Sequence, residues 1–170
     1  TAYGTGKLRH NLFQENDAVQ EFDTLVLRAG ANDGYAWADA KDTEQFIRDE
    51  FGRGLHRNMG HPASHGRLIH VYLNGVYWGM YDLVERANED FSAAYFGGDA
   101  VDWDSNNAGD VKNGDLQAWN TFNSLTAAAT TTAAYQQMQG NNPGGTRNPA
   151  YPVYLDKLNY IDYMIANIWG

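Results

Sequence analysis

The sequence contains no cysteine, which excludes disulfide bonds, a thiolate nucleophile and cysteine-ligated zinc or iron–sulfur sites. Basic residues are also scarce: 12 Lys and Arg stand against 21 Asp and Glu, a formal net charge of −9. A surface of this sign repels phosphodiester backbones and anionic lipids, so we expect no nucleic-acid partner. No apolar run approaches the roughly 18 residues that cross a bilayer, so we expect no membrane insertion.

The chain also lacks the short motifs of common enzyme mechanisms, since it has no P-loop, no GxSxG elbow and no HExxH zinc motif. What it does have is the composition of a folded protein, with 43% hydrophobic and 14% aromatic residues. Its 170 residues are enough to bury a core without covalent staples. It starts without Met and ends on the apolar run Ile168–Gly170, so we expect a fragment of a larger protein.

The first half of the chain carries strand and helix signals in alternation. Residues 22–28 predict a strand, because the run around Leu25 is continuously apolar. A helix is predicted from Asp42 or Thr43, with Gln45 as its capping-box partner, up to the stop signal at Gly60. Its expected buried row comprises Phe46, Ile47, Phe51, Leu55 and Met59. Gly52 and Gly54 each cost this helix about 1 kcal/mol, which predicts close packing on a sheet.

The strongest local signal follows this helix. Residues 68–73 and 76–84 are rich in β-branched and aromatic residues, and Asn74 and Gly75 lie between them. Asn-Gly adopts positive φ at both turn positions at little cost, so the pattern predicts a β-hairpin.

The second half of the chain is predicted to be mainly helical. A short helix over residues 89–96 is followed by an acidic, Asn- and Gly-rich loop. Asp115 is expected to cap a helix that breaks near Thr130–Thr132, and Asp156 to cap a final helix. The apolar residues predicted to face inward on the final helix are Leu158, Ile161, Ile165 and Ile168.

The fold class is therefore predicted as α+β, with an antiparallel sheet around a central Asn-Gly hairpin, one helix packed on it and a helical C-terminal part. Three segments are expected. Residues 1–98 form the strand–helix–hairpin portion, residues 99–114 an acidic connector, and residues 115–170 a helical segment.

One carboxylate on the predicted helix stands out. Glu50 falls among the apolar residues, where a buried carboxylate needs a partner. Arg28, which ends the preceding apolar strand, is a candidate partner. A basic residue on a strand paired with an acid on the next helix is the plan of a protein-kinase small lobe, where the pair positions nucleotide phosphates. The alternative is a structural ion pair, or a Glu50 that bends toward Arg53.

Two further places could face a nucleotide. Glu85 and Arg86 follow the hairpin directly, where a kinase-like chain crosses between lobes and offers backbone groups to adenine. The alternative is a solvated strand end. Lys112 is a lone lysine in an acidic loop and is otherwise a surface residue.

Histidines and aromatics suggest two other kinds of site. His61, His65 and His70 lie close in sequence, which is a weak signal for zinc, and ordinary surface or turn roles are the alternative. Aromatic residues crowd the hairpin and could stack on sugar rings, although such residues more often pack a core or an interface. These residues are Tyr72, Tyr77, Trp78 and Tyr81.

Several segments together resemble the CotH kinase family, named for spore-coat protein H. The run RLIHVYLNGVYWGMYDLVER (67–86) is similar to the family's signature of an apolar strand, Asn-Gly, an aromatic-Gly step and a final Glu-Arg. Upstream, the resemblance includes LRAG (27–30), IRDE (47–50) and MG (59–60). Downstream, it includes DF (90–91), YFGG (95–98), the stretch 114–119, QGNNP (139–143) and YIDYM (160–164).

This resemblance implies an atypical protein kinase, secreted or on the surface of a bacterial cell. It implies transfer of the γ-phosphoryl group of ATP, with Mg²⁺ or another divalent metal, to Ser or Thr of a protein substrate. Arg28, Glu50, Glu85, Arg86 and Lys112 are then the expected nucleotide-binding residues.

The sequence also departs from the family pattern. The metal-binding Asn/Asp-rich stretch of the family follows the final helix, and the sequence ends at Gly170. We therefore expect the catalytic aspartates to be absent and these 170 residues to be inactive alone. The alternative function, from another class, is a non-catalytic surface module that binds carbohydrate or protein.

Overall fold

The structure is a computed structural model that describes residues 6–31, 34 and 44–169. Its internal contacts divide the chain into two compact units, Thr1–Ala100 and Val101–Gly170, which are described separately below. Among the described helices, none combines the length and the apolar character needed to cross a membrane.

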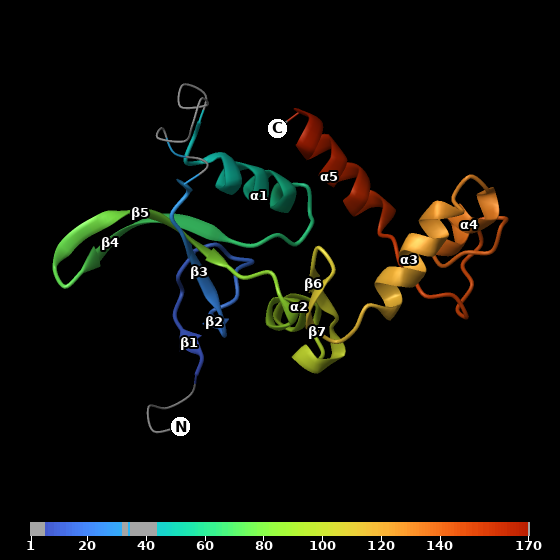
Figure 1. The fold of residues 1–170 in the computed structure, drawn as a ribbon, viewed down its shortest axis with the longest axis horizontal. Coiled ribbons are helices and arrows are strands. Elements are labelled where there is room, and N and C mark those ends of the chain that lie inside the picture. Colours follow the sequence, from blue (N-terminus) through green and yellow to red (C-terminus); the bar gives the residue numbers. More distant parts are fainter. Residues whose placement is uncertain (1–5, 32–33, 35–43, 170) are drawn as a thin grey trace. The chain divides into compact units, whose positions relative to one another are not determined.

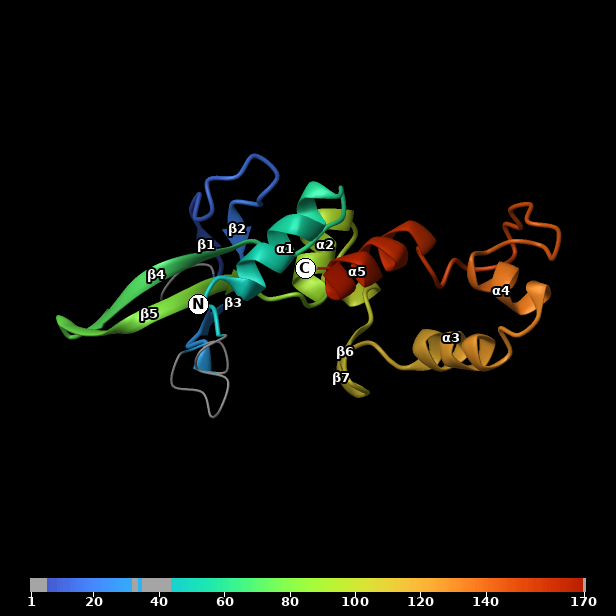
Figure 2. The ribbon, with the colours of Figure 1, turned by 90° about the horizontal axis from the view of Figure 1, so that it is seen from above.

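The first unit is built around a three-stranded antiparallel sheet in the order β3-β5-β4. Its strands are β3 (Leu25–Arg28), β4 (Gly66–Leu73) and β5 (Val76–Glu85). Asn74 and Gly75 join β4 to β5 with positive φ values of 50° and 82°. β3 pairs only with residues 82–85 of β5, so the β4–β5 ribbon extends well beyond it (Figures 1 and 2). Together with the helices, this sheet confirms the predicted α+β class.

A second, short pair of strands precedes the sheet. β1 (Leu8–Arg9) pairs antiparallel with β2 (Glu21–Phe22), and the long loop between them carries Phe13. Phe13 packs edge-on against Phe22, with ring centroids 5.5 Å apart, and both side chains are buried. The predicted strand over 22–28 is thus interrupted between Phe22 and Leu25.

Helix α1 (Arg48–Asn58) begins later than predicted. Asp42 and Thr43 lie outside the described residues, and residues 44–47 are not helical. Ile47 occupies the N-cap position without a side-chain cap, so the capping box expected at Gln45 is absent from the described residues. The end of the helix is as predicted, because Gly60 follows the C-cap Met59 with a φ of 91°.

The face that α1 turns to the sheet is charged, which corrects the expected apolar row. Arg53 and Arg57 are largely buried, whereas Ile47 and Phe51 are 56% and 60% exposed. The reason lies in the sheet, which presents Asp82 to the helix. Gly52 also does not pack closely, because nothing lies within 4 Å of the place where its Cβ would stand.

Helix α2 (Glu89–Phe96) follows β5 after a short connector. Asn88 caps it by accepting a hydrogen bond from the main-chain N–H of Phe91 over 3.1 Å. Gly97 ends it with a φ of 86°. The predicted bounds are confirmed, because capping is a local property that the sequence carries directly.

The residues from Ala100 to Asn113, which end the first unit and begin the second, were predicted to be a loop. They form a 3₁₀ turn, η3 (Ala100–Asp102), and a small antiparallel hairpin of β6 (Ser105–Asn107) and β7 (Asp110–Asn113). Ala108 and Gly109 provide its turn with φ values of 52° and 89°. The prediction missed this hairpin because its strands are short and polar and carry no apolar alternation.

Three helices complete the second unit: α3 (Gln117–Ala127), α4 (Thr132–Met138) and α5 (Lys157–Trp169). The break between α3 and α4 comes where the Thr-rich run predicted it. Asp156 caps α5 by accepting hydrogen bonds from Leu158 and Asn159. The side chains of α5 predicted to face inward are exposed, with Leu158 at 66% and Ile168 at 63%.

Candidate functional site

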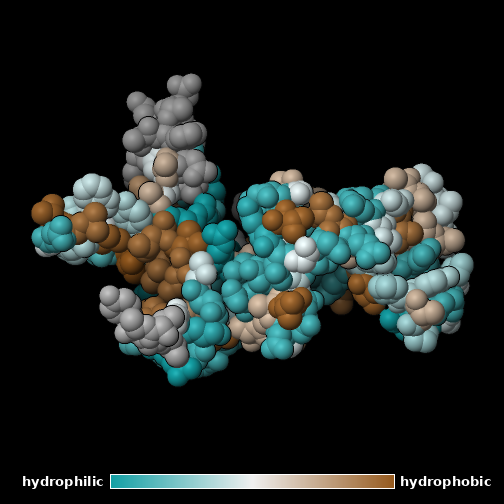
Figure 3. Space-filling model, turned by 60° about the horizontal axis from the view of Figure 1, so that its bottom comes forward, coloured by the Kyte–Doolittle hydropathy of each residue, from teal (hydrophilic) through white to brown (hydrophobic). Residues whose placement is uncertain are grey.

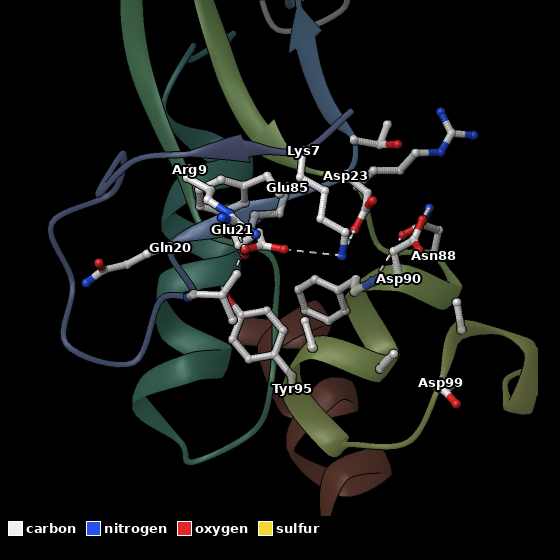
Figure 4. Close-up of a pocket in the computed structure, with 18 of the residues that line it drawn as sticks. Lys7, Arg9, Gln20, Glu21, Asp23, Glu85, Asn88, Asp90, Tyr95 and Asp99 are labelled. Carbon is white, nitrogen blue, oxygen red and sulfur yellow. Dashed lines mark hydrogen bonds and ion pairs between the residues drawn. The ribbon is translucent and has the colours of Figure 1, made fainter. Parts of the chain in front are cut away.

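A cavity of the first unit lies beside the connector between β5 and α2. Its volume is about 830 Å³. One wall is formed by β1, β2 and the residues around them, another by the connector at Glu85 and Arg86, and a third by α2 (Figure 4). A cavity of this size falls within the range of small-molecule binding pockets.

Acidic and basic side chains share this cavity. Lys7 Nζ lies 2.9 Å from Asp23 Oδ2 and 3.5 Å from Glu21 Oε1, between the two carboxylates (Figure 4). Arg9 Nε donates to Glu21 Oε2 over 2.7 Å. The hydrogen bond and the charge of Asp23 raise the pKa of Lys7. The cations on this wall are therefore already neutralised by protein carboxylates.

The connector itself lies at the cavity wall. Arg86 is exposed, follows the last residue of β5 and lines the cavity. The Glu85 N–H donates to the carbonyl of His65 over 3.0 Å, so it is not available to a ligand. The main chain from Arg86 onward is thus the part of the connector at which a planar heterocycle with its own donor and acceptor could bind.

Behind this wall, Glu85 is held in a buried hydrogen-bonded cluster. Its Oε2 accepts from the main-chain N–H of His65 over 2.8 Å and lies 2.9 Å from His65 Nδ1. Its Oε1 accepts from the hydroxyl of Tyr95 over 2.7 Å. The side chains of His65 and Glu85 are only 2% and 3% exposed. The Glu85 carboxylate is therefore held by His65 and Tyr95, and the role predicted at this position concerns main-chain groups rather than this side chain.

The charges in this cluster shift the acidities of its members. Burial lowers the pKa of His65, but contacts with Glu85 and Asp17 outweigh it, so the pKa is raised. Partial desolvation acts to raise the pKa of Asp17, but contact with His65 outweighs it, so that pKa is lowered. Burial raises the pKa of Tyr95 well above its usual range. Tyr95 thus remains a neutral O–H donor to Glu85.

Arg28 is paired on α1, although with a different carboxylate from the one predicted. Its Nη1 bonds Asp49 Oδ2, the residue before Glu50. Both side chains are about one-third to two-fifths exposed, so the pair contributes modestly to stability. A small crevice beside the pair is lined by Gly30, Phe46 and Asp82, among others.

Glu50 follows the alternative interpretation and binds arginines of its own helix. Its Oε2 lies 2.8 Å from Arg53 Nη2, and its Oε1 lies 3.2 Å from Arg57 Nη2. Arg53 Nη2 also lies 2.6 Å from Asp82 Oδ2 on β5. Gly66 makes this approach feasible, because a Cβ there would overlap Glu50 Oε2 and lie 2.7 Å from Arg53 Nη2.

The remaining predicted residues belong to other elements of the chain. Lys112 belongs to β7 of the second unit and bonds Asp110. His61 stacks edge-on with His56, with ring centroids 5.0 Å apart, and His70 lies on β4 with its Nδ1 3.1 Å from the Tyr77 hydroxyl. Of the three histidines considered for zinc, His65 lies beside carboxylates, those of Glu15, Asp17 and Glu85.

The sequence analysis missed the residues that meet His65. Glu15 and Asp17, in the loop between β1 and β2, come within 3.7 Å and 3.2 Å of His65 Nε2. Tyr95 lies 3.0 Å from His65 Nδ1. No local pattern marks these residues, because they approach His65 only through pairing of the strands.

Comparison with known proteins gives one match. The family model described as CotH kinase protein matches residues 7–170. No curated protein and no solved structure matches the chain. The match covers both units and includes the connector at the cavity. The chain therefore belongs to the CotH kinase family.

Proposed function

We propose that this chain is part of an ATP-dependent phosphotransferase and that the cavity beside the β5–α2 connector binds the adenosine end of the nucleotide. The observation that carries the proposal is the position of the β5–α2 connector, with Glu85 and Arg86, on the wall of a cavity of about 830 Å³. Membership of the CotH kinase family supports it. We further propose that the γ-phosphoryl group is transferred to Ser or Thr of a protein substrate.

The residues in the cavity fit a nucleoside better than a bare triphosphate. Lys7 and Arg9 are committed to carboxylates, and the lining adds the acidic Asp90 and Asp99. A triphosphate would meet repulsion there unless a divalent cation accompanied it. Mg²⁺, when bound, neutralises phosphate oxygens, and carboxylates such as Asp90 and Asp99 are the hard oxygen ligands that it prefers.

The other predicted nucleotide-binding residues take supporting roles in this proposal. Arg28 with Asp49, and Glu50 with Arg53 and Arg57, fix α1 against the sheet that ends in the connector. Arg86 is exposed at the cavity, where its guanidinium can approach a phosphate. We also propose that Lys112 contacts the nucleotide, as the family resemblance implies.

Calorimetric titration with Mg²⁺–ATP tests the binding site. Ala94 lies on α2, lines the cavity and is exposed, so Ala94→Trp should fill the cavity without disturbing the core. We expect this variant to lose ATP binding at least tenfold. Ala118→Trp, an equal substitution at an exposed position of α3, should bind ATP like the wild type. Equal loss in both variants, or no ATP binding by the wild type, would overturn the site.

An assay with ATP labelled at the γ-phosphate tests the proposed transfer to Ser or Thr of a protein substrate. Incorporation into Ser or Thr of a peptide library by the full-length protein, blocked by Ala94→Trp, is the expected result, and residues 1–170 alone should transfer no phosphate. ATP binding without any transfer by the full-length protein would leave a nucleotide-binding module and reject the phosphotransferase.

The alternative, a carbohydrate- or protein-binding module, is favoured by one observation. Tyr72, Tyr77 and Trp78 on the β4–β5 ribbon are 62%, 52% and 61% exposed, and the rings of Tyr72 and Tyr77 lie 5.3 Å apart. Hydrophobic atoms extend from the ribbon tip along the sheet (left side of Figure 3). Quenching of tryptophan fluorescence by a bacterial cell-wall polysaccharide, abolished in Trp78→Ala, would support this alternative.

A further inference from the structure

Three potential metal ligands from distant parts of the first unit come together at one point. Glu15 and Asp17 lie in the loop between β1 and β2, and His65 immediately precedes β4. One ligand atom from each residue lies within 4.8 Å of the other two. His65 Nε2 is 3.2 Å from Asp17 Oδ1 and 3.7 Å from Glu15 Oε2.

The opposite edge of the imidazole is fixed in the way that metal-binding histidines usually are. Nδ1 lies 2.9 Å from Glu85 Oε2, which is a hydrogen-bond acceptor only. Tyr95 donates its own hydroxyl proton to Glu85 Oε1, so Nδ1 carries the proton that bonds Oε2. The lone pair of the neutral ring is then on Nε2, which lies within 3.7 Å of both loop carboxylates. A carboxylate behind a histidine orients the ring and increases its basicity as a ligand.

Nε2 is the second observation that points to a ligand. The His65 side chain is 2% exposed, and Nε2 makes no hydrogen bond in the described part of the chain despite its closeness to Asp17. A buried polar atom without a partner is rare in folded proteins. A cation between Nε2 and the two carboxylates would satisfy all three groups at once.

The local charge agrees with a divalent cation. Three carboxylates, those of Glu15, Asp17 and Glu85, surround the imidazole. The guanidinium of Arg57 lies 3.3 Å from Glu15, but it is shared with Glu50 at 3.2 Å. The cluster thus keeps an excess of negative charge that one guanidinium does not balance. Asp17 is 66% exposed, so water can reach the site and complete the coordination.

We propose that Glu15, Asp17 and His65 bind a divalent transition-metal cation of the Zn²⁺ or Mn²⁺ class, separate from any Mg²⁺ that accompanies a nucleotide. An imidazole nitrogen with two carboxylates suits these metals, whereas Mg²⁺ prefers oxygen ligands alone. The cation ties the β1–β2 loop to the sheet. Val19 of the same loop donates its N–H to the Tyr95 hydroxyl over 3.1 Å, so the metal also holds the wall of the cavity.

Calorimetric titration of chelator-treated protein with Zn²⁺, and separately with Mg²⁺, tests the proposal. We expect one tight Zn²⁺ site and at least a hundredfold weaker Mg²⁺ binding. Asp17→Asn and Glu15→Gln should each weaken Zn²⁺ binding at least tenfold. Both residues are exposed, so neither substitution should prevent folding, which the circular dichroism spectrum checks.

Two histidine variants are the matched controls. His70→Gln removes an exposed histidine on β4, and His61→Gln removes one partner of the His56–His61 pair. Both variants should bind Zn²⁺ like the wild type. Loss of binding in His61→Gln with full binding in Asp17→Asn would place the metal elsewhere and overturn the proposal. No Zn²⁺ or Mn²⁺ binding by the wild type would overturn it too.

Cobalt provides a readout that does not depend on affinity alone. Co²⁺ bound through an imidazole and two carboxylates should give visible absorption bands in the wild type. Those bands should be lost or shifted in Asp17→Asn and unchanged in His70→Gln. Identical spectra in Asp17→Asn and the wild type would reject Asp17 as a ligand.

Discussion

His65, which immediately precedes β4, and Glu85, the last residue of β5, are joined by three contacts. The main-chain N–H and the Nδ1 of His65 both meet Glu85 Oε2, at 2.8 Å and 2.9 Å. The main-chain N–H of Glu85 donates to the His65 carbonyl over 3.0 Å. This reciprocal contact joins the start of β4 to the end of β5, where the candidate cavity begins.

Glu85→Gln tests how much this contact contributes. The amide presents an NH₂ group to partners that are themselves donors, so at least one buried donor loses its acceptor. Loss of a buried, charge-assisted hydrogen bond should lower the free energy of unfolding by about 3 kcal/mol. Urea denaturation measures this change. Glu21→Gln, which affects exposed pairs only, is the control and should cost much less. Equal losses would contradict the importance of the buried contact.

Gly66→Ala tests the close approach of α1 to β4. The added Cβ would overlap Glu50 Oε2 and crowd Arg53 and Asp82, so the ion pairs must shift. We expect a loss of about 1–3 kcal/mol in the free energy of unfolding, as for other overpacked sites.

Gly54→Ala is the matched control on α1. Its Cβ would meet only Arg57 Nη2 at 3.8 Å, an ordinary contact. Alanine favours the helix over glycine by about 1 kcal/mol, so this variant should be more stable than the wild type. A stabilising Gly66→Ala, or a destabilising Gly54→Ala, would contradict the geometry of this interface.

A double-mutant cycle tests the choice of partner for Arg28. Because Arg28 bonds Asp49, the Arg28→Ala and Asp49→Ala substitutions should be coupled by about 0.2–1 kcal/mol in unfolding free energy. Arg28→Ala and Glu50→Ala should be additive, since Glu50 bonds Arg53 and Arg57. Thermal denaturation of the six proteins at low salt provides the measurement. Stronger coupling of Arg28 to Glu50 would restore the pair predicted from the sequence.

The pKa of Lys7 tests its contact with Asp23 on the charged wall of the cavity. Contact with Asp23 raises the pKa of Lys7 above 10.5, so the folded state holds this proton more tightly than the unfolded state. The stabilisation is therefore complete below pH 10.5 and disappears as the pH rises through the raised pKa. NMR titration of the Lys7 side chain should show a late midpoint, and Asp23→Asn should move it back. An unchanged midpoint in Asp23→Asn would contradict the contact.

Local chemistry explains which parts of the fold the sequence predicts well. The bounds of α2 follow from Asn88 and Gly97, and the start of α5 follows from Asp156. In each case a side chain satisfies main-chain groups within three residues, so the information lies in a short segment. The connector at Glu85 and Arg86 was also identified as a candidate site from its position after the β5 segment.

Partners across the fold explain what could not be predicted. The periodicity of residues 46–59 favoured an apolar face for α1, but the sheet presents Asp82 and lets Arg53 approach at Gly66. Asp49 and Glu50 are adjacent on α1, so their side chains point about 100° apart around the helix axis. The rotation of α1 about this axis therefore decides which of the two carboxylates meets Arg28. Sequence spacing alone does not determine that rotation.

The sequence by itself determined the α+β class, the ends of α2 and the absence of cysteine chemistry, because these depend on composition and on contacts within a few residues. Only the tertiary structure decided that Glu15, Asp17 and Tyr95 surround His65 and that the Glu85 carboxylate is bonded by His65 and Tyr95. Strand pairing brings these residues together from distant parts of the chain, and the identity of each residue carries no record of its partner.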